Sequence, residues 1–131
     1  MNTNECNKDI GSHPIGPYTT AIQVENLIFI SGQISSSIDK NNENNSIILQ
    51  TKNILKNIKC ILKRYNAKVE NVIKTTLFIT DLEKLNIVND TYKKFFSKYS
   101  NRFPTRSCVE VSKLPQNSLI EIEAIAYKSL T

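Results

Sequence analysis

The sequence has few of the residues on which the commonest catalytic sites depend. Its single histidine, His13, lies in a polar N-terminal segment, so we set Ser-His-Asp and Cys-His catalysis aside. The three glycines form neither a Walker motif nor a G-x-G-x-x-G fingerprint, and no carboxylate–histidine cluster has the spacing of metal ligands. We therefore expect neither a nucleotide cofactor nor a catalytic metal.

Cysteines and long apolar runs are also scarce. Cys6, Cys60 and Cys108 are an odd number without a C-x-x-C pair, which indicates neither a disulfide framework nor a zinc site, and we expect reduced thiols. The longest apolar run, Leu27 to Ile30, is far below the roughly 20 residues of a membrane span. Met1 to His13 has the character of neither a secretory signal nor a transit peptide, which predicts a cytoplasmic protein that does not enter a membrane.

Positive charge is present but dispersed. The formal net charge of +5 could attract nucleic acid, yet the Lys and Arg residues form no block and no aromatic-interleaved stripe. The pattern favours a solvated basic surface, and nucleic acid is not an expected partner. The length is that of one domain with one core, so we expect residues 1–131 to form a single domain.

Hydrophobic periodicity predicts strands and helices in the order ββαβαββ. We expect Ser46 to be the N-cap of the first helix, and Thr80 with Glu83 to form a capping box at the start of the second. The pair Glu25-Asn26 reads as the turn of an opening hairpin. The predicted segments are strands over 21–24 and 27–30, a helix over 47–62, a strand over 69–80, a helix over 80–96, and strands over 105–111 and 118–127.

This order predicts an α+β domain with one mixed sheet and two helices on one face. The second strand is apolar on both sides, because Leu27 and Phe29 alternate with Ile28 and Ile30. Two helices can cover only one face, so we expect the other to be buried against further copies of the chain. A solvated sheet that is merely rich in apolar residues is the alternative.

Polar side chains on the last two strands are candidates for chemistry. Alternation places Arg106, Cys108 and Glu110 on one face of their strand, and Glu121 and Glu123 on one face of theirs. An arginine on a strand offers a planar fork to a carboxylate. Arg106 and a glutamate could line a cleft between subunits, or Arg106 could neutralise one of the glutamates in an ion-pair network. Cys108 by itself reads more readily as a small buried strand residue than as a nucleophile.

Several of these positions lie in segments that resemble the reactive-intermediate deaminase family, also called RidA or YjgF. The resemblance extends over nearly the whole chain, and it departs in the loop after Gln33, where the Asn-rich tract 41–45 replaces the Gly and Pro that relatives often carry. Four segments carry it: Ile15 to Tyr18, Ile30 to Gln33, Phe103 to Val111 and Ile120 to Ala126.

The resemblance implies a chorismate-mutase-like fold, a homotrimer with active sites between subunits, and no cofactor. The implied reaction is the hydrolysis of enamines and imines derived from 2-aminoacrylate and related species to 2-keto acids and ammonia, as in a 2-iminobutanoate/2-iminopropanoate deaminase. Family members described as translation inhibitors or ribonucleases, and a non-catalytic ligand-binding or chaperone-like trimer, are the alternatives. The implied site comprises Arg106 on the substrate carboxylate, Glu121 on the attacking water, and Tyr18, Ser31, Gly32 and Cys108 lining the pocket, with Tyr18 and Cys108 also counted as catalytic.

Overall fold

The chain builds one five-stranded sheet and two long helices. The computed structural model describes residues 16–129. In these residues the order ββαβαββ is confirmed, and short 3-10 turns lie at Val69–Asn71, Leu82–Lys84 and Pro115–Asn117. The main elements are β1 (Ala21–Val24), β2 (Leu27–Gln33), α1 (Glu43–Arg64), β3 (Val72–Ile79), α2 (Leu85–Tyr99), β4 (Thr105–Glu110) and β5 (Ile120–Tyr127).

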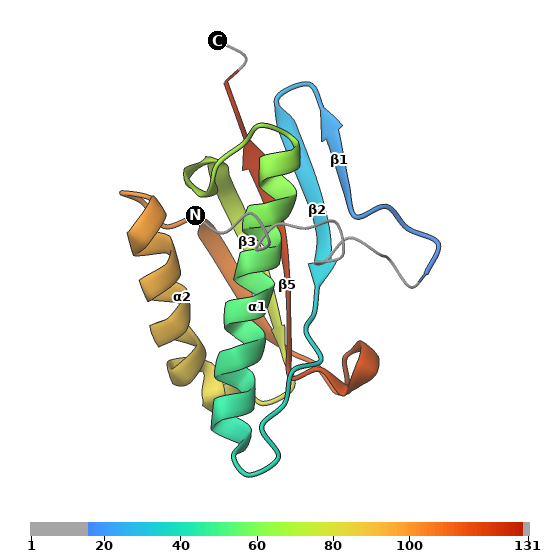
Figure 1. The fold of residues 1–131 in the computed structure, drawn as a ribbon, viewed down its shortest axis with the longest axis vertical. Helices are drawn as coiled ribbons and strands as arrows, with labels where there is room; N and C mark the ends of the chain where they lie inside the picture. The colour runs from blue at the N-terminus through green and yellow to red at the C-terminus, as the bar shows by residue number, and fades with distance from the viewer. Residues whose placement is uncertain (1–15, 130–131) are drawn as a thin grey trace.

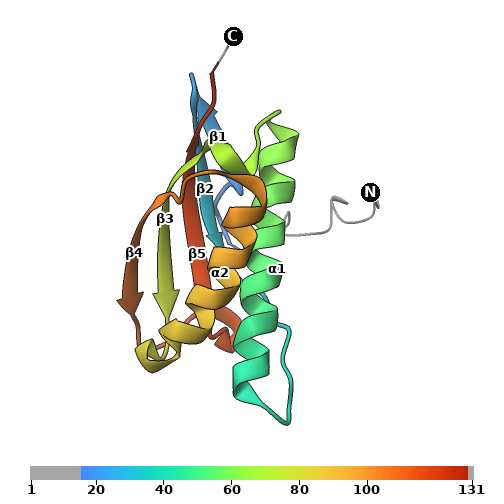
Figure 2. The ribbon, with the colours of Figure 1, turned by 90° about the vertical axis from the view of Figure 1, so that its left-hand side faces the viewer.

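The strands are ordered β1-β2-β5-β3-β4 across the sheet (Figure 1). Val24 pairs with Leu27 around the expected Glu25-Asn26 turn, where Glu25 adopts a φ of 52°. All neighbouring strands are antiparallel except β3 and β4, which are parallel and joined through α2. Both helices lie on the same face of the sheet (Figure 2). The prediction of one mixed sheet with two helices on one face is confirmed.

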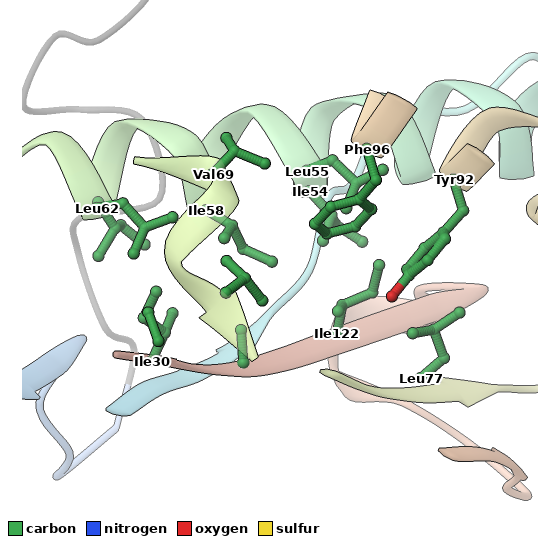
Figure 3. Close-up of a cluster of buried hydrophobic side chains, with 14 of the residues drawn as sticks. Ile30, Ile54, Leu55, Ile58, Leu62, Val69, Leu77, Tyr92, Phe96 and Ile122 are labelled. Carbon is green, nitrogen blue, oxygen red and sulfur yellow. The ribbon is translucent and has the colours of Figure 1, made fainter. Parts of the chain in front are cut away.

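Alternation along the strands decides which side chains meet the helices. Ile120 and Ile122 of β5, like Ile28 and Ile30 of β2, are buried on the helix side. They pack against the apolar faces of α1 and α2, as the close-up in Figure 3 shows around Phe96. Burial of an isoleucine side chain of this kind contributes about 1.5–3 kcal/mol.

The opposite face of the sheet carries many apolar side chains that nothing covers in the single chain. Its aliphatic and aromatic side chains come from several strands, and Phe29, which alternates with buried Ile28 and Ile30, is 42% exposed. Large hydrophobic residues at this level of exposure include Ile22, Val24, Val109 and Tyr127. Several large apolar side chains exposed on one face of a sheet are typical of a surface that binds another protein chain.

Both helix starts differ from the predictions. The helix α1 begins within the Asn-rich tract, where the extended Asn42 accepts the Asn45 N–H at 3.2 Å; Ser46 lies inside the first turn and donates to the Asp39 carbonyl. Thr80 instead donates its N–H to the Leu119 carbonyl at the end of β3. Asparagine is a strong N-cap where the backbone before a helix is extended. The Asn-rich tract was therefore a signal for the start of α1, which the apolar periodicity alone did not reveal.

The second helix is preceded by a short 3-10 turn, which the expected capping box did not anticipate. Asp81 caps that turn by accepting the Glu83 N–H at 3.0 Å, and α2 follows from Leu85. The predicted capping box had Thr80 accept the Glu83 N–H. Asp81, two residues before Glu83, accepts this N–H instead, because its carboxylate forms the same kind of cap.

The cysteines depart from expectation at one position. Cys108 is a free thiol, but Cys60, a buried residue of α1, is disulfide-bonded, so the expectation of a reduced thiol is wrong there. Separation along the sequence does not limit such bonds, since only the distance between the two residues in the fold matters. Cys6 lies outside the described residues. No helix in residues 16–129 is long and apolar enough to cross a membrane.

Candidate active site

Arg106 has a defined position although its side chain is exposed. It lies on the edge strand β4 beside Thr75 of β3, on the side of the sheet that carries the helices. Its Nη1 donates to Oδ1 of Asn89 at 2.8 Å, and its guanidinium lies 5.0 Å above the centre of the Tyr92 ring. A hydrogen bond and a cation–π contact together orient the planar fork.

Tyr92 is itself fixed by a hydrogen bond to the sheet. Its hydroxyl is 2.6 Å from Oγ1 of buried Thr75. Burial raises the pKa of the Tyr92 phenol, although the hydrogen bond with Thr75 and the positive charge of Arg106 act in the opposite direction. The ring under Arg106 therefore stays neutral at physiological pH, and it is fixed by the same strand that pairs with β4.

A shallow hollow lies next to the guanidinium. Its volume is about 320 Å³. Lys93, Phe103 and Pro104 line it together with Arg106, Asn89 and Tyr92. Cys108 follows two residues later on the same face of β4, opposite Leu77, and is half-buried. This side of the sheet edge offers a cation and an aromatic wall, which suits a small ligand with a carboxylate.

Glu121 lies on the other face of the sheet. It pairs with Phe78 on β3, whereas its neighbours Ile120 and Ile122 point to the helices. On its other side the ladder between β2 and β5 shifts register between Ile30 and Gln33. A Cβ atom built on Gly32 would collide with the Glu121 carboxylate, so the glycine leaves the space that this side chain occupies.

The surroundings of Glu121 change its acidity. Burial raises the pKa of the Glu121 carboxyl above its ordinary range, and the negative charge of nearby Glu123 raises it further. The sequence alone does not decide whether burial or a neighbouring arginine has the larger effect on the pKa of this glutamate. Within one chain burial dominates, because Arg106 lies on the opposite face.

The remaining expected pocket residues are Ser31 and Tyr18. Ser31 is next to Gly32 and donates its hydroxyl to the Thr20 carbonyl at 3.0 Å. It also lines a hollow of about 280 Å³ on the open face, together with Glu123 and Lys74. Tyr18 is 49% exposed in the segment before β1.

One chain therefore does not bring all six expected residues together. The helix side of the β4 edge holds Arg106 and Cys108, and the open face holds Glu121, Gly32 and Ser31. Nor is Arg106 part of an ion-pair network within residues 16–129, since its partner is a neutral asparagine. The Glu110 carboxylate on the same strand accepts the Leu82 N–H instead.

Two supporting residues went unnoticed in the sequence. Asn89 and Tyr92 lie three positions apart and thus share one face of α2. The available signal for this pair was an asparagine about one helical turn before a tyrosine on the same face of the helix. Among the described residues, no group of three or more His, Cys, Asp or Glu side chains could hold a metal ion.

Comparison with known proteins identifies the family. The sequence profile described as Endoribonuclease L-PSP matches residues 10–128. This chain belongs to that family. A RutC family protein of Buchnera aphidicola is 56% identical over 126 residues, which cover 93% of this chain and 98% of the relative. The Escherichia coli protein named 2-iminobutanoate/2-iminopropanoate deaminase is 40% identical over 114 residues, covering 87% and 89%.

A solved structure of the L-PSP family shares the fold. The YjgF gene product of E. coli superposes with a TM-score of 0.79 at 39% identity, covering 88% of this chain and 91% of that one. The resemblance to the RidA or YjgF family and the expected fold are therefore confirmed. The L-PSP match includes β2, β4 and β5, the three strands that carry the candidate site.

Proposed function

We propose that this L-PSP family chain is a 2-iminobutanoate/2-iminopropanoate deaminase, acting as a homotrimer with its active sites between subunits. The observation that carries the proposal is the seating of Glu121, a half-buried carboxylate of raised pKa held over Gly32. The relative that is 40% identical and bears that name supports the substrate class. A carboxylate with a pKa closer to neutrality is suited to accept and return a proton.

The separation of the two groups supports a shared site. Arg106 and Glu121 lie on opposite faces of one sheet, so they can meet one substrate only if they come from different copies of the chain. The exposed apolar face around Phe29 offers the surface through which copies would associate, and Glu121 lies on that face. A neighbour's β4 edge would then bring Arg106 to Glu121.

In the proposed reaction, Arg106 binds the carboxylate of a 2-imino acid and Glu121 holds a water molecule. The water oxygen forms a bond to C2 while Glu121 accepts its proton, and the electrons of the C2=N bond move to nitrogen. Glu121 then returns the proton to the amine of the tetrahedral adduct. Glu121 next accepts the hydroxyl proton of the adduct and passes it to the amine. The C2–N bond breaks with its electrons on nitrogen, ammonia leaves, and the oxygen forms the C=O bond of the 2-keto acid. Positioning is the main requirement, because the imine is already electrophilic.

The pocket would be completed by the other four expected residues. Ser31 and Gly32 would lie beside the reacting water, Cys108 beside the bound carboxylate, and Tyr18 over the opening. None of them needs to form a covalent bond with the substrate. A cofactor plays no part in this scheme, since water and one proton acceptor suffice.

The deciding experiment follows pyruvate formation from 2-iminopropanoate generated in situ. We expect Arg106→Ala to lower kcat/KM about 10- to 100-fold, the value of a charge-assisted contact. We expect Glu121→Ala to lower kcat about 100-fold or more. Arg102→Ala and Glu83→Ala, which alter exposed side chains of the same types, serve as matched controls. No acceleration by the folded wild-type protein would overturn the proposal.

Two other functions make different predictions in the same assay. A non-catalytic ligand-binding trimer would bind a 2-keto acid through Arg106 but show no turnover, and Glu121→Ala would leave its affinity unchanged. The family description Endoribonuclease suggests RNA cleavage. The chain has a single histidine, so the histidine pair that often cleaves RNA is missing. RNA cleavage that survives Arg106→Ala would favour that function.

A further inference from the structure

A broad hollow on the described surface lies away from the candidate active site. It is a groove of about 830 Å³ lined by residues of α1 and α2. The two helices lie side by side over the sheet (Figure 2). The floor of the groove is apolar and comes from both helices. The floor residues are Ile48 and Leu55 of α1 and Ile87, Phe95 and Tyr99 of α2.

Lysines stand along both walls of this groove. Lys52, Lys56 and Lys59 come from α1, and Lys94 and Lys98 from α2. Among the described residues, Asp90 is the one acidic side chain that lines the groove, so the five lysines leave it strongly positive. Five lysines that are separated along the sequence thus line one groove of the fold.

Most of this charge remains available to a ligand. The single ion pair along the walls within the described residues joins Lys94 to Asp90 at 3.5 Å, and both side chains are exposed. At one end of the groove Lys59 donates to the Tyr99 hydroxyl at 3.2 Å, and that hydrogen bond lowers the pKa of the phenol. Lys98 also lies over the Tyr99 ring, 5.3 Å from its centre. Positive potential is thus concentrated where the apolar floor ends.

The dimensions of the groove fit a short helix. Ile48 and Lys59 are eleven positions apart on α1, which corresponds to about 16 Å, or three helical turns. Apolar side chains at i, i+4, i+7 and i+11 of an added helix would match such a floor, and acidic side chains on its flanks would face the lysines of both walls.

RNA and a membrane surface fit these features less well. Most of the floor is aliphatic, and its two rings, Phe95 and Tyr99, pack edge to face at 5.2 Å and 61°, which leaves no open platform for stacked bases. A flat lipid surface would not enter a groove. We propose that the groove between α1 and α2 is a docking site for an acidic amphipathic helix of a partner protein.

The test uses a fluorescein-labelled synthetic peptide of four helical turns with Leu at i, i+4, i+7 and i+11 and Glu on both flanks. Fluorescence anisotropy against the full-length protein should show saturable binding. A peptide of the same composition in scrambled order, and one with the leucines replaced by serine, should bind about tenfold or more weakly. Equal binding of all three peptides would overturn the proposal.

Charge-reversal variants locate the binding surface. Lys56→Glu/Lys98→Glu changes one exposed lysine on each wall, and Lys40→Glu/Lys63→Glu makes the same charge change at exposed positions outside the groove. We expect about tenfold or greater loss of peptide affinity in the first pair and little change in the second. Equal losses in both pairs would mean nonspecific attraction and would overturn the proposal.

Competing ligands complete the test. Tighter binding of single-stranded RNA or of vesicles containing phosphatidylserine than of the peptide, abolished by Lys56→Glu/Lys98→Glu, would reject the helix in favour of that ligand. Imine hydrolysis should be unchanged in both lysine pairs, since neither pair contacts the candidate active site. The docking site and the proposed reaction can therefore fail independently.

Discussion

Arg106 illustrates how an exposed charge acquires a fixed place. Long cationic side chains on a surface usually sample many rotamers, and holding one of them costs conformational entropy. Here Asn89 accepts one N–H of the guanidinium and the Tyr92 ring supports its flat face. In the proposed reaction the fork would therefore be arranged for the substrate carboxylate before the substrate arrives, which reduces the ordering that binding requires.

Removing this support should weaken substrate binding more than turnover. We expect Asn89→Ala to raise KM for 2-iminopropanoate about tenfold, because a hydrogen bond to a charged group contributes about 1.5 kcal/mol, while kcat changes less than KM. Asn86→Ala, on the same helix and away from Arg106, is the control and should leave both constants unaltered. An unchanged KM in Asn89→Ala would show that Asn89 does not position the arginine.

The acidity of Glu121 has a consequence for stability that does not depend on any enzyme activity. Its folded-state pKa is raised, so the folded chain binds the proton more tightly than the unfolded chain, and stability falls as pH rises from the unfolded pKa through the folded one. We expect Glu121→Gln to melt at a higher temperature than the wild type at pH 7, with the difference disappearing below the unfolded pKa. A lower melting temperature of the variant at pH 7 would contradict the assignment.

At the scale of elements, the register shift between β2 and β5 makes room for the carboxylate. The atoms that an added Cβ on Gly32 would meet belong to the flexible end of Glu121. We expect Gly32→Ala to displace that side chain with little loss of stability and to lower kcat about tenfold or more. In a Glu121→Ala background the same change should have no further effect on kcat. Equal effects in both backgrounds would place the influence of Gly32 elsewhere.

The start of α1 depends on one side chain of the Asn-rich tract. We expect Asn42→Ala to lower the free energy of unfolding by about 1 kcal/mol, because the Asn45 N–H loses its acceptor. Urea denaturation measures the change, and Asn41→Ala, one residue earlier, is the control. A larger loss in Ser46→Ala would not restore the predicted cap. The Ser46 hydroxyl donates to the Asp39 and Asn42 carbonyls and accepts the Asp39 N–H, which lies before the helix.

The presence of the strands and helices was thus predicted better than the residues at which the helices begin. Every strand and helix predicted from periodicity is present, because burial of an apolar face leaves a repeat of two or 3.6 residues in the sequence. Caps leave no such repeat. Several Asn, Ser, Thr and Asp residues near a helix start compete for the same backbone donors, and the path of the preceding loop decides between them.

At the scale of the whole molecule, the opposite placement of Arg106 and Glu121 predicts complementation between inactive chains. Arg106→Ala and Glu121→Ala proteins, unfolded together and refolded at equal concentrations, should regain activity. If each site takes its arginine from one subunit and its glutamate from the next, about one quarter of the sites in randomly mixed trimers contain both. The imine assay and sedimentation velocity on the mixture provide the measurements.

Two outcomes would reject this arrangement. No regained activity in a properly mixed trimer would mean that both residues act from one chain, against the geometry of the sheet. A sedimentation coefficient of a monomer for the active wild-type protein would remove the need for an interface. Phe29→Lys, on the uncovered apolar face, is expected to yield monomers without imine hydrolysis, because a charge buried in an interface without a partner is strongly unfavourable.

The order of elements, the buried faces of the strands and the grouping of Arg106 with Cys108 all follow from the sequence, because they depend on spacing within a single strand or helix. Whether Arg106 and Glu121 share a face does not, since alternation along two strands says nothing about their relative phase. That phase is set by strand order and register, which place β4 at the edge beside Thr75 and β5 inside the sheet beside Phe78. The support from Asn89 and Tyr92 and the lysine-lined groove likewise arise only when separate elements pack together.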